Sequence, residues 1–247
     1  MSGNPNHAGK LVVVDVGAAG GLQQPWAGVE EHVVAVMFEP NPVMAAELRQ
    51  QKTKFSEVIV IESGLSDHVG QETLHITMSE GCCSLLTPND DFLGIYTVAP
   101  AFRIRHDVPV AVTTYQTLYR AGRVPKPDLV KIDVQGLEYE VLTGFGDLLD
   151  ACMAVQLEAH VYPIYRGQKL LGELVALLAE RGLVLRKLVP VNHFDGDAVE
   201  FDAWFTLRHD RLAGLDEIGR WKLGMIHREW GLPLQTRQFA PNSWGTL

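Results

Sequence analysis

The stretch that decides the fold is Val14-Asp15-Val16-Gly17-Ala18-Ala19-Gly20-Gly21. It closes an apolar run, 11–16, of the kind that forms a buried strand. A first helix is predicted from about Leu22, with Pro25 in its first turn, where proline is tolerated. Glycines at the end of a strand let a ligand approach the backbone closely. Because open α/β sheets bind ligands beyond the carboxyl ends of their strands, this turn is predicted to line a binding site.

After this turn, strand-like and helix-like segments alternate along the chain. Buried strands are predicted at 33–38, 57–61, 129–134, 153–157, 183–189 and 203–207, and helices at 42–54, 137–149, 170–181 and 215–230. Asn41 and Pro42 suit the N-cap and the first position of the second helix. This alternation predicts a single α/β domain, 1–247, with a doubly wound, mainly parallel seven-stranded sheet. Its core spans about 11–208, and a helical C-terminal extension spans about 210–247.

The segment 71–113 interrupts the alternation. Its first part, 71–77, is typical of an edge strand, 79–100 is rich in turn residues, and alternate positions near Val108 to Val112 are apolar. We therefore expect a small β insertion between the third and fourth strands of the main sheet. The part 79–109 is expected to shape the binding site.

Composition and charge narrow the class of protein. Of the 247 residues, 47% are hydrophobic and 21% are charged, as in a globular protein with a sizeable core. The net charge of -9 argues against a general nucleic-acid binder, which would carry a basic face. The three cysteines, Cys82, Cys83 and Cys152, lack zinc-ligand spacing and suit a reducing compartment. A polar start and the lack of a long apolar run predict a cytoplasmic protein with no membrane span.

Asp15 distinguishes between two kinds of cofactor. The spacing G-x-x-G-G differs from the G-x-G-x-x-G of dinucleotide-binding turns, because Ala19 stands at the second glycine position. A carboxylate two residues before Gly17 would repel a diphosphate and attract the ammonium group of S-adenosylmethionine. The sequence therefore favours S-adenosylmethionine over NAD. The plain alternative is that Asp15 caps the turn and nothing binds there.

Polar residues at three further strand ends suit the same ligand. Glu39, about 20 residues after the glycine turn, is placed to accept hydrogen bonds from the ribose hydroxyls. Asp67, after the third strand, is placed to accept one from the adenine amine, and both acids also fit ordinary loop positions. Lys131 and Asp133 interrupt an apolar strand, so each should be paired or lie at its open end. We expect Lys131 to form an ion pair with Glu138, and Asp133 to face the ligand.

In their order along the chain, these motifs resemble the FkbM family of methyltransferases. The resemblance covers roughly 11–208 and includes Asp15-Val16-Gly17-Ala18, Phe38-Glu39-Pro40-Asn41-Pro42, Leu65-Ser66-Asp67 with Gly70, Ser84-Leu85-Leu86, Lys131-Ile132-Asp133 with Gly136 and Glu138, and Leu157-Glu158 near Tyr162. It implies a class I methyltransferase (Rossmann-like) fold, with S-adenosylmethionine as donor and S-adenosylhomocysteine as product. It also implies transfer to a hydroxyl group of a sugar, a polysaccharide or a natural product.

The resemblance assigns roles to individual residues. Asp15 and Gly17 would flank the methionine part of the donor, Glu39 would hold the ribose, Asp67 the adenine, and Asp133 would lie near the reactive methyl. The set expected to bind the cofactor is Asp15, Gly17, Ala18, Gly20, Glu39, Pro40, Asn41, Ser66, Asp67 and Asp133. The chain departs from the usual family pattern at Ala19, at Gln135 and in Gly81-Cys82-Cys83-Ser84, which leaves the acceptor less defined than the donor.

A hydroxyl acceptor is a weak nucleophile and benefits from a general base. Asp133, Glu158 and His160 are the candidates, because Glu158-Ala159-His160 ends the next predicted strand and a neutral histidine can accept a proton near neutral pH. The same three side chains could hold a divalent metal ion, but the sequence shows no metal-binding spacing, and no metal ligand is predicted.

Three other functions stay open at the level of sequence. They are a nicotinamide-dependent oxidoreductase, a non-catalytic module that binds S-adenosylmethionine, and a nucleic-acid base methyltransferase. The last would carry an Asn/Asp-Pro-Pro-Tyr/Phe motif, which this sequence lacks, so no nucleic-acid partner is predicted. The acceptor is expected to be a small molecule or a saccharide. The oligomeric state is left open, with a homodimer among the options.

Overall fold

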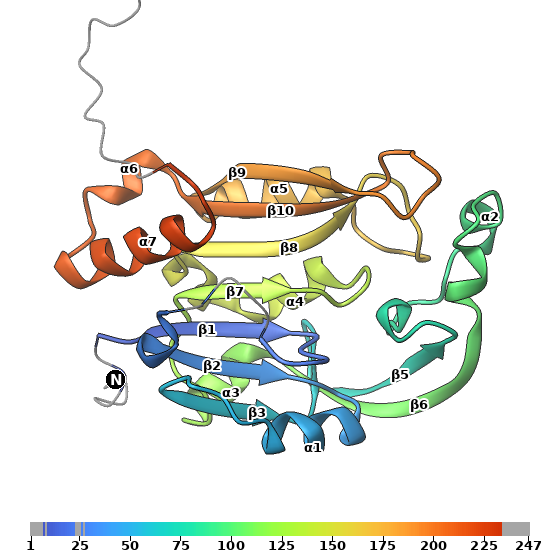
Figure 1. Ribbon diagram of the computed structural model, residues 1–247, viewed down its shortest axis with the longest axis horizontal. Helices are drawn as coiled ribbons and strands as arrows, with labels where there is room; N and C mark the ends of the chain where they lie inside the picture. Colours follow the sequence, from blue (N-terminus) through green and yellow to red (C-terminus); the bar gives the residue numbers. More distant parts are fainter. Residues whose placement is uncertain (1–6, 8, 23–25, 27, 234–247) are drawn as a thin grey trace, which may run out of the picture.

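The main sheet has the predicted doubly wound architecture. The computed structural model describes residues 7, 9–22, 26 and 28–233, which form a seven-stranded sheet in the order β3-β2-β1-β7-β8-β10-β9 (Figure 1). Its strands are β1 (Leu11–Val16), β2 (Val33–Phe38), β3 (Glu57–Ile61), β7 (Leu129–Ile132), β8 (Ala154–His160), β9 (Leu183–Val191) and β10 (Glu200–Leu207). The first five strands of this order, β3, β2, β1, β7 and β8, run parallel to one another. Strand β10 is antiparallel to both of its neighbours, β8 and β9. The strand order reverses between β1 and β7, where doubly wound sheets bind ligands.

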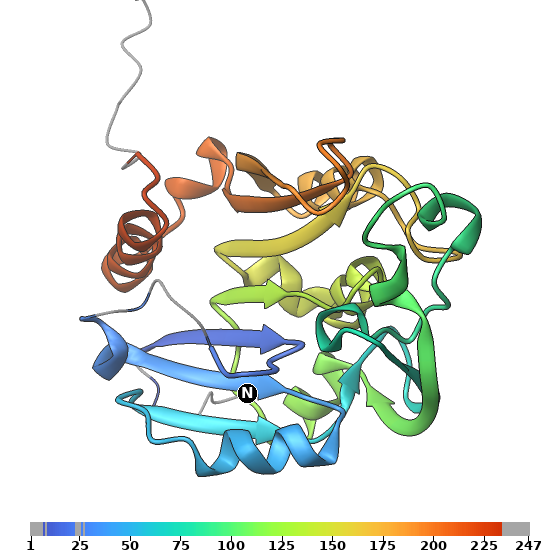
Figure 2. The same ribbon diagram turned by 45° about the vertical axis from the view of Figure 1, so that its right-hand side comes forward.

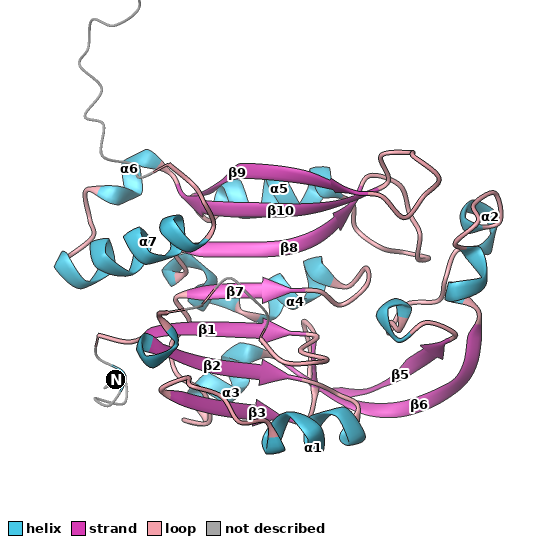
Figure 3. Ribbon diagram, viewed as in Figure 1, coloured by secondary structure: helices cyan, strands magenta, loops and turns pink. Residues whose placement is uncertain are grey.

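Helices cover both faces of this sheet. In the view of Figure 3, α3, α4 and α5 lie behind the strands, and α1 and α7 lie in front. These helices are α1 (Pro42–Gln50), α3 (Tyr115–Arg120), α4 (Glu138–Gly144), α5 (Leu171–Glu180) and α7 (Glu217–Glu229), with the short α6 (His209–Leu212) before α7. The predicted C-terminal extension thus includes α6 and α7, while 234–247 lie outside the described residues. No helix in the described part of the chain has both the length and the apolar character needed to span a membrane.

Local chemistry explains where the helices begin and end. The Asn41 side chain accepts a hydrogen bond from the Val43 backbone nitrogen at 3.0 Å, which confirms the predicted N-cap of α1. Helix α1 ends at Gln50, four residues earlier than predicted, because 51–54 are exposed polar residues with nothing to bury. The predicted helix 137–149 is also shorter. It ends at Gly144 and continues as the 3-10 helix η5 (Gly146–Ala151).

Two further helix predictions differ from the structure. Most of the helix expected from Leu22 lies outside the described residues, including Pro25, and the described Leu22 and Trp26 are not helical. The next described element is a single 3-10 turn, η2 (Glu30–His32). Helix α3 was not predicted, because the β-branched residues before it read as a continuing strand. The Thr114 side chain caps it by accepting a hydrogen bond from the Thr117 backbone nitrogen at 3.0 Å.

The predicted β insertion is a separate three-stranded sheet. Strands β4 (Gly64–Leu65), β5 (Gly70–Thr77) and β6 (Ile104–Thr113) pair in the order β4-β6-β5. Between β5 and β6 the chain forms η3 (Glu80–Cys82), α2 (Asp90–Leu93) and η4 (Ala99–Phe102). Figure 2 shows this sheet beside the carboxyl ends of β1, β2 and β7. The insertion therefore stands where a ligand of the main sheet would bind.

Candidate active site

The glycine turn after β1 is tied to the ends of two neighbouring strands. The backbone nitrogens of Gly17 and Ala18 both donate to the Phe38 carbonyl oxygen, at 3.1 and 3.0 Å. Gly17 has a φ of +79°, and a Cβ atom there would lie 1.9 Å from the Asp133 carbonyl oxygen. Glycine is required at this position for both reasons. The turn thus brings the carboxyl ends of β1, β2 and β7 into direct contact.

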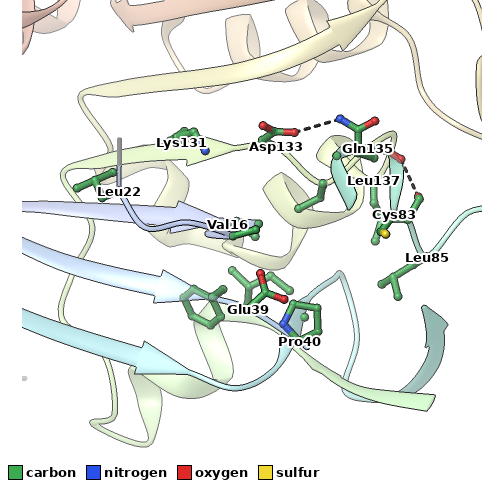
Figure 4. Close-up of a pocket in the computed structure, with 18 of the residues that line it drawn as sticks. Val16, Leu22, Glu39, Pro40, Cys83, Leu85, Lys131, Asp133, Gln135 and Leu137 are labelled. Carbon is green, nitrogen blue, oxygen red and sulfur yellow. Dashed lines mark hydrogen bonds between the residues drawn. The ribbon is translucent and has the colours of Figure 1, made fainter. Parts of the chain in front are cut away.

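A cavity of about 400 Å³ opens beside this turn (Figure 4). Pockets of this size suit small-molecule ligands. Its lining comes from the glycine turn, the ends of β2 and β7, and the insertion, and includes Gly17, Ala19, Gly21, Glu39, Pro40, Asp133, Val134, Gln135, Glu80, Gly81, Cys83, Ser84 and Leu85. Of the residues predicted to bind a cofactor, the structure places Gly17, Glu39, Pro40 and Asp133 on this lining.

Lys131 forms its ion pair with Asp15 and not with Glu138, which corrects the sequence-based expectation. Asp15 and Lys131 are direct partners in the parallel register of β1 and β7, so their side chains share one face of the sheet. The Lys131 Nζ atom donates to Asp15 Oδ1 at 2.9 Å. Asp15 is 1% exposed, and its Oδ2 atom is buried with no hydrogen-bond partner among the described residues. Asp15 therefore stands behind Lys131, which lines the cavity.

Glu138 instead caps the turn between β7 and α4. Its Oε1 atom accepts hydrogen bonds from the backbone nitrogens of Val134 and Gly136, at 3.3 and 3.1 Å. Glu138 is 1% exposed, and burial raises the pKa of its carboxyl group to about 7. This side chain fixes the backbone that carries Asp133 and Gln135.

Glu39 is held at the end of β2. Its Oε1 atom accepts a hydrogen bond from the Asn41 backbone nitrogen at 2.8 Å, and the residue is 5% exposed. Burial raises the pKa of Glu39, although the hydrogen bond from Asn41 opposes this shift. In Figure 4 the Glu39 side chain lies between the β2 end and Pro40, at the edge of the cavity.

Other residues predicted to bind the cofactor surround this site without lining the cavity that the described residues enclose. They are Asp15, Ala18, Gly20, Asn41, Ser66 and Asp67. The exposed Asp67 carboxylate lies 2.8 Å from His68 Nδ1 and holds the pKa of that histidine above its ordinary value. The binding roles of these residues stay predictions.

Gln135 joins two carboxyl groups and was missed as a site residue. Its Nε2 atom donates to Asp133 Oδ1 at 3.2 Å and to Glu158 Oε1 at 2.7 Å. The Tyr165 hydroxyl lies 2.9 Å from Gln135 Oε1 and 3.0 Å from the Cys82 carbonyl oxygen, so it connects the turn after β7 to the insertion. The backbone of Gln135 has a φ of +57°, an unusual conformation for a residue other than glycine. The departure from the family pattern at Gln135 was the only sequence signal for this bridge.

Glu158, His160 and Glu200 form a buried cluster at the end of β8. Atoms from the three side chains lie within 4.8 Å of one another, and His160 Nε2 is 3.6 Å from Glu158 Oε1 and 3.8 Å from Glu200 Oε2. Burial raises the pKa of Glu158 well above its ordinary value, and the carboxylates of Asp133 and Glu200 add to the shift. A raised pKa favours the protonated form of the carboxyl group and makes its ionised form a stronger base.

Gln168 selects the tautomer of the neutral His160 ring. The Tyr165 backbone nitrogen donates to Gln168 Oε1 at 2.9 Å, so the Gln168 amide nitrogen must face His160 Nδ1, 3.0 Å away. His160 Nδ1 therefore accepts, and the proton of the neutral ring lies on Nε2, directed between the two glutamates. A protonated Nε2 can neither ligate a metal nor accept a proton. This leaves Asp133 and Glu158 as the stronger candidates for a general base.

Comparisons with known proteins find methyltransferases similar to this chain. The family model for the methyltransferase FkbM domain matches residues 15–185. The hexuronic acid methyltransferase AglP of Haloferax volcanii is 28% identical over 160 residues, which cover 60% of this chain and 56% of that protein. The chain thus spans about half the length of this curated relative.

Solved structures with a similar arrangement include two methyltransferases. Methyltransferase FkbM from Methylobacillus flagellatus KT has a TM-score of 0.48 and 13% identity, covering 80% of this chain and 44% of that one. Magnesium protoporphyrin IX methyltransferase from Synechocystis PCC 6803, solved with bound S-adenosylmethionine, has a TM-score of 0.43 and 10% identity, covering 80% and 70%.

Proposed function

This chain belongs to the FkbM family of methyltransferases, and from that membership we propose that it transfers a methyl group from S-adenosylmethionine to a hydroxyl group of a saccharide or natural-product acceptor. The observation that carries the proposal is the meeting of Gly17, Glu39 and Asp133, from three strand ends, around one cavity. The resemblance in sequence assigns these three residues to the methionine, the ribose and the methyl group of the donor.

The residues at the cavity fit this donor. The Glu39 carboxylate lies at the carboxyl end of β2, where the ribose hydroxyls of a nucleoside would need a hydrogen-bond acceptor. When bound, S-adenosylmethionine supplies an electrophilic methyl group on a positively charged sulfur.

The protein then has two tasks, which are to align the acceptor and to receive its proton. Gln135 holds Asp133 and Glu158 together, so that two carboxyl groups face one region beyond β7 and β8. We assign the acceptor proton to one of these two groups. The insertion forms one wall of the site, because Ser84 and its neighbours line the cavity and Ser84 Oγ donates to the Gln135 carbonyl oxygen at 2.7 Å.

The saccharide acceptor rests on a single relative. AglP acts on a hexuronic acid, and such a sugar offers a carboxylate as well as hydroxyl groups as methyl acceptors. In this chain, the groups beyond Asp133 are themselves carboxyl groups, those of Glu158 and Glu200. Because these groups repel a further carboxylate when they are ionised, we favour a hydroxyl group as the acceptor.

A methyl-transfer assay tests this function. The purified chain is incubated with S-adenosylmethionine carrying a labelled methyl group and with a panel of neutral sugars, uronic acids and glycans. We expect labelled product that resists mild alkali, because methyl ethers survive conditions that cleave methyl esters. Loss of the label in alkali would contradict hydroxyl methylation, and absence of label from every acceptor, despite donor binding, would favour the non-catalytic module. Asp133→Asn is the inactive control.

A further inference from the structure

Lys131 places a positive charge inside the cavity. It is the third of the four residues of β7, between the buried Val130 and Ile132, so its position in a central strand is otherwise apolar. Its side chain is 23% exposed, whereas that of its partner Asp15 is 1% exposed. The ion pair thus has a closed side formed by Asp15 and an open side formed by the Lys131 ammonium group, which lines the cavity (Figure 4).

The ammonium group of Lys131 is charged and has donors to spare. Burial alone would lower the pKa of Lys131, but the carboxylates of Asp15 and Asp133 outweigh burial and raise it above the ordinary value. A lysine ammonium has three hydrogens. Among the described residues, Asp15 Oδ1 is the hydrogen-bond acceptor that uses one of them. The remaining hydrogens are available to a group in the cavity.

Neighbouring residues extend this polar row across the sheet. Gln156 on β8 is the register partner of Lys131 and also lines the cavity. Asp15, Lys131 and Gln156 therefore form a line of one acid, one cation and one amide over three adjacent strands. Of these three residues, Lys131 and Gln156 face the cavity, where their N–H donors suit a carboxylate.

We propose that Lys131, held in place by Asp15, binds the α-carboxylate of the methyl donor, and that this pair selects a donor with an intact amino-acid tail. This inference rests on the proposed function, since S-adenosylmethionine has the α-carboxylate as its sole anionic group. It gives Asp15 a positioning role: the buried carboxylate holds the ammonium of Lys131 at the cavity wall. A cavity built this way recognises the methionine end of the donor through its carboxylate.

The test compares two ligands by titration calorimetry. They are S-adenosylhomocysteine and its decarboxylated analogue, which differ only in the α-carboxylate. For the wild-type chain we expect S-adenosylhomocysteine to bind about tenfold or more tightly than the analogue, as for a charge-assisted hydrogen bond. In Lys131→Met, affinity for S-adenosylhomocysteine should fall to that of the analogue, and affinity for the analogue should stay within about threefold of wild type.

Two further variants keep the result interpretable. Lys131→Met alone leaves Asp15 buried without a cation and can unfold the chain, so Asp15→Asn with Lys131→Met provides a neutral pair, checked by thermal unfolding. Lys187 lies in the same row of the sheet, beside Trp204, with its Nζ atom 4.5 Å from the indole centroid. Lys187→Met is the matched control, and it should preserve the difference between the two ligands.

Each result has a distinct meaning. If the wild type binds both ligands equally, or if the variants still discriminate as the wild type does, the role given to Lys131 is wrong while the proposed function stands. If the folded wild type binds neither ligand, the proposed function itself fails, and the inference fails with it.

Discussion

Three carboxyl groups at the strand ends lie in different electrostatic settings, and the difference decides what each can do. Asp15 is neutralised by Lys131 at 2.9 Å. Glu39 is buried and accepts one hydrogen bond from the backbone nitrogen of Asn41. Asp133 lies in the cavity and shares the Gln135 amide with Glu158. Because Asp15 is already paired, its charge does not by itself exclude a diphosphate. Membership of the family, and not this charge, supports S-adenosylmethionine over NAD.

Glu39→Ala should weaken donor binding. The carboxylate lines the cavity at the place where the ribose hydroxyls are expected, and hydrogen bonds to a charged group contribute about 1.5–3 kcal/mol. We expect at least about a tenfold loss of affinity for S-adenosylhomocysteine by calorimetry. Glu62→Ala is the control, because Glu62 also follows a strand but is half-exposed and bound to Arg49 at 2.9 Å. Unchanged affinity in Glu39→Ala would remove Glu39 from the site.

Asp133→Ala should abolish turnover while donor binding remains measurable. Asp133 lines the cavity beyond the end of β7, and its carboxyl group shares the Gln135 amide with Glu158. Loss of a general base typically reduces rates by about 10²–10⁴-fold. Turnover and binding are measured separately on the same preparation. Complete loss of binding would instead show that Asp133 serves only to hold the cofactor.

Glu138 should make stability depend on pH. Its pKa is about 7 in the folded chain and 4.5 when unperturbed, so folding favours the protonated form. The resulting stability is fully present below about pH 4.5 and is lost as the pH rises through about 7. The free energy of unfolding is expected to fall by a total on the order of 3 kcal/mol over this pH range. Glu138→Gln keeps an acceptor oxygen for Val134 and Gly136 but cannot ionise.

Urea unfolding of both proteins isolates this effect, since the other titrating groups are shared. We expect similar free energies of unfolding at about pH 4.5, and a more stable Glu138→Gln variant at about pH 8, by up to about 3 kcal/mol. A difference between the two proteins that is constant with pH would show that Glu138 does not titrate in this range.

At the scale of elements, the site depends on how closely the ends of β1 and β7 approach. The Gly17 turn packs on the Asp133 carbonyl oxygen, and Gly144 in α4 packs on that of Ser66, where a Cβ atom would lie 2.0 Å away. These two contacts position the turns after β1, β4 and β7 around the cavity. Side chains at either glycine would push these elements apart.

Gly17→Ala should therefore separate strands and abolish donor binding. The added Cβ atom would overlap the Asp133 carbonyl oxygen at 1.9 Å in a backbone with a φ of +79°. We expect the free energy of unfolding, measured with urea, to fall by about 3 kcal/mol or more. Gly122→Ala is the control, because Gly122 has a φ of +69° but no described atom within 4 Å of the added Cβ. Gly122→Ala should lower the free energy of unfolding by only about 1 kcal/mol. An equal decrease in both variants would contradict the role of close packing at Gly17.

The sequence predicts these elements better than it predicts their contacts. Apolar runs ended by glycine or proline located β1, β2 and β3, and with them Gly17 and Glu39, because such punctuation is local. The ion pair of Asp15 with Lys131 depends on strand register over 116 residues, which no local pattern encodes. Ser84 and Gln135 are likewise 51 residues apart in the sequence, so the hydrogen bond that ties the insertion to the turn after β7 was not predictable.

At the scale of the whole molecule, two sheets cooperate in one site. The main sheet supplies the strand ends, and the insertion supplies the wall from Glu80 to Leu85 (Figures 2 and 4). The doubly wound, mainly parallel form of the main sheet followed from the alternation of strands and helices, because parallel strands need crossover connections. The wall could not be predicted, because turn-rich segments take their shape from tertiary contacts such as that between the Tyr165 hydroxyl and the Cys82 carbonyl oxygen, 3.0 Å apart.

The central claim is that this cavity binds S-adenosylmethionine. Calorimetric titration of the purified chain with S-adenosylhomocysteine, beside an identical titration with NAD, tests it most directly. We predict saturable binding of S-adenosylhomocysteine at one site per chain and no heat of binding with NAD. Saturable binding of NAD, with none of S-adenosylhomocysteine, would contradict the account.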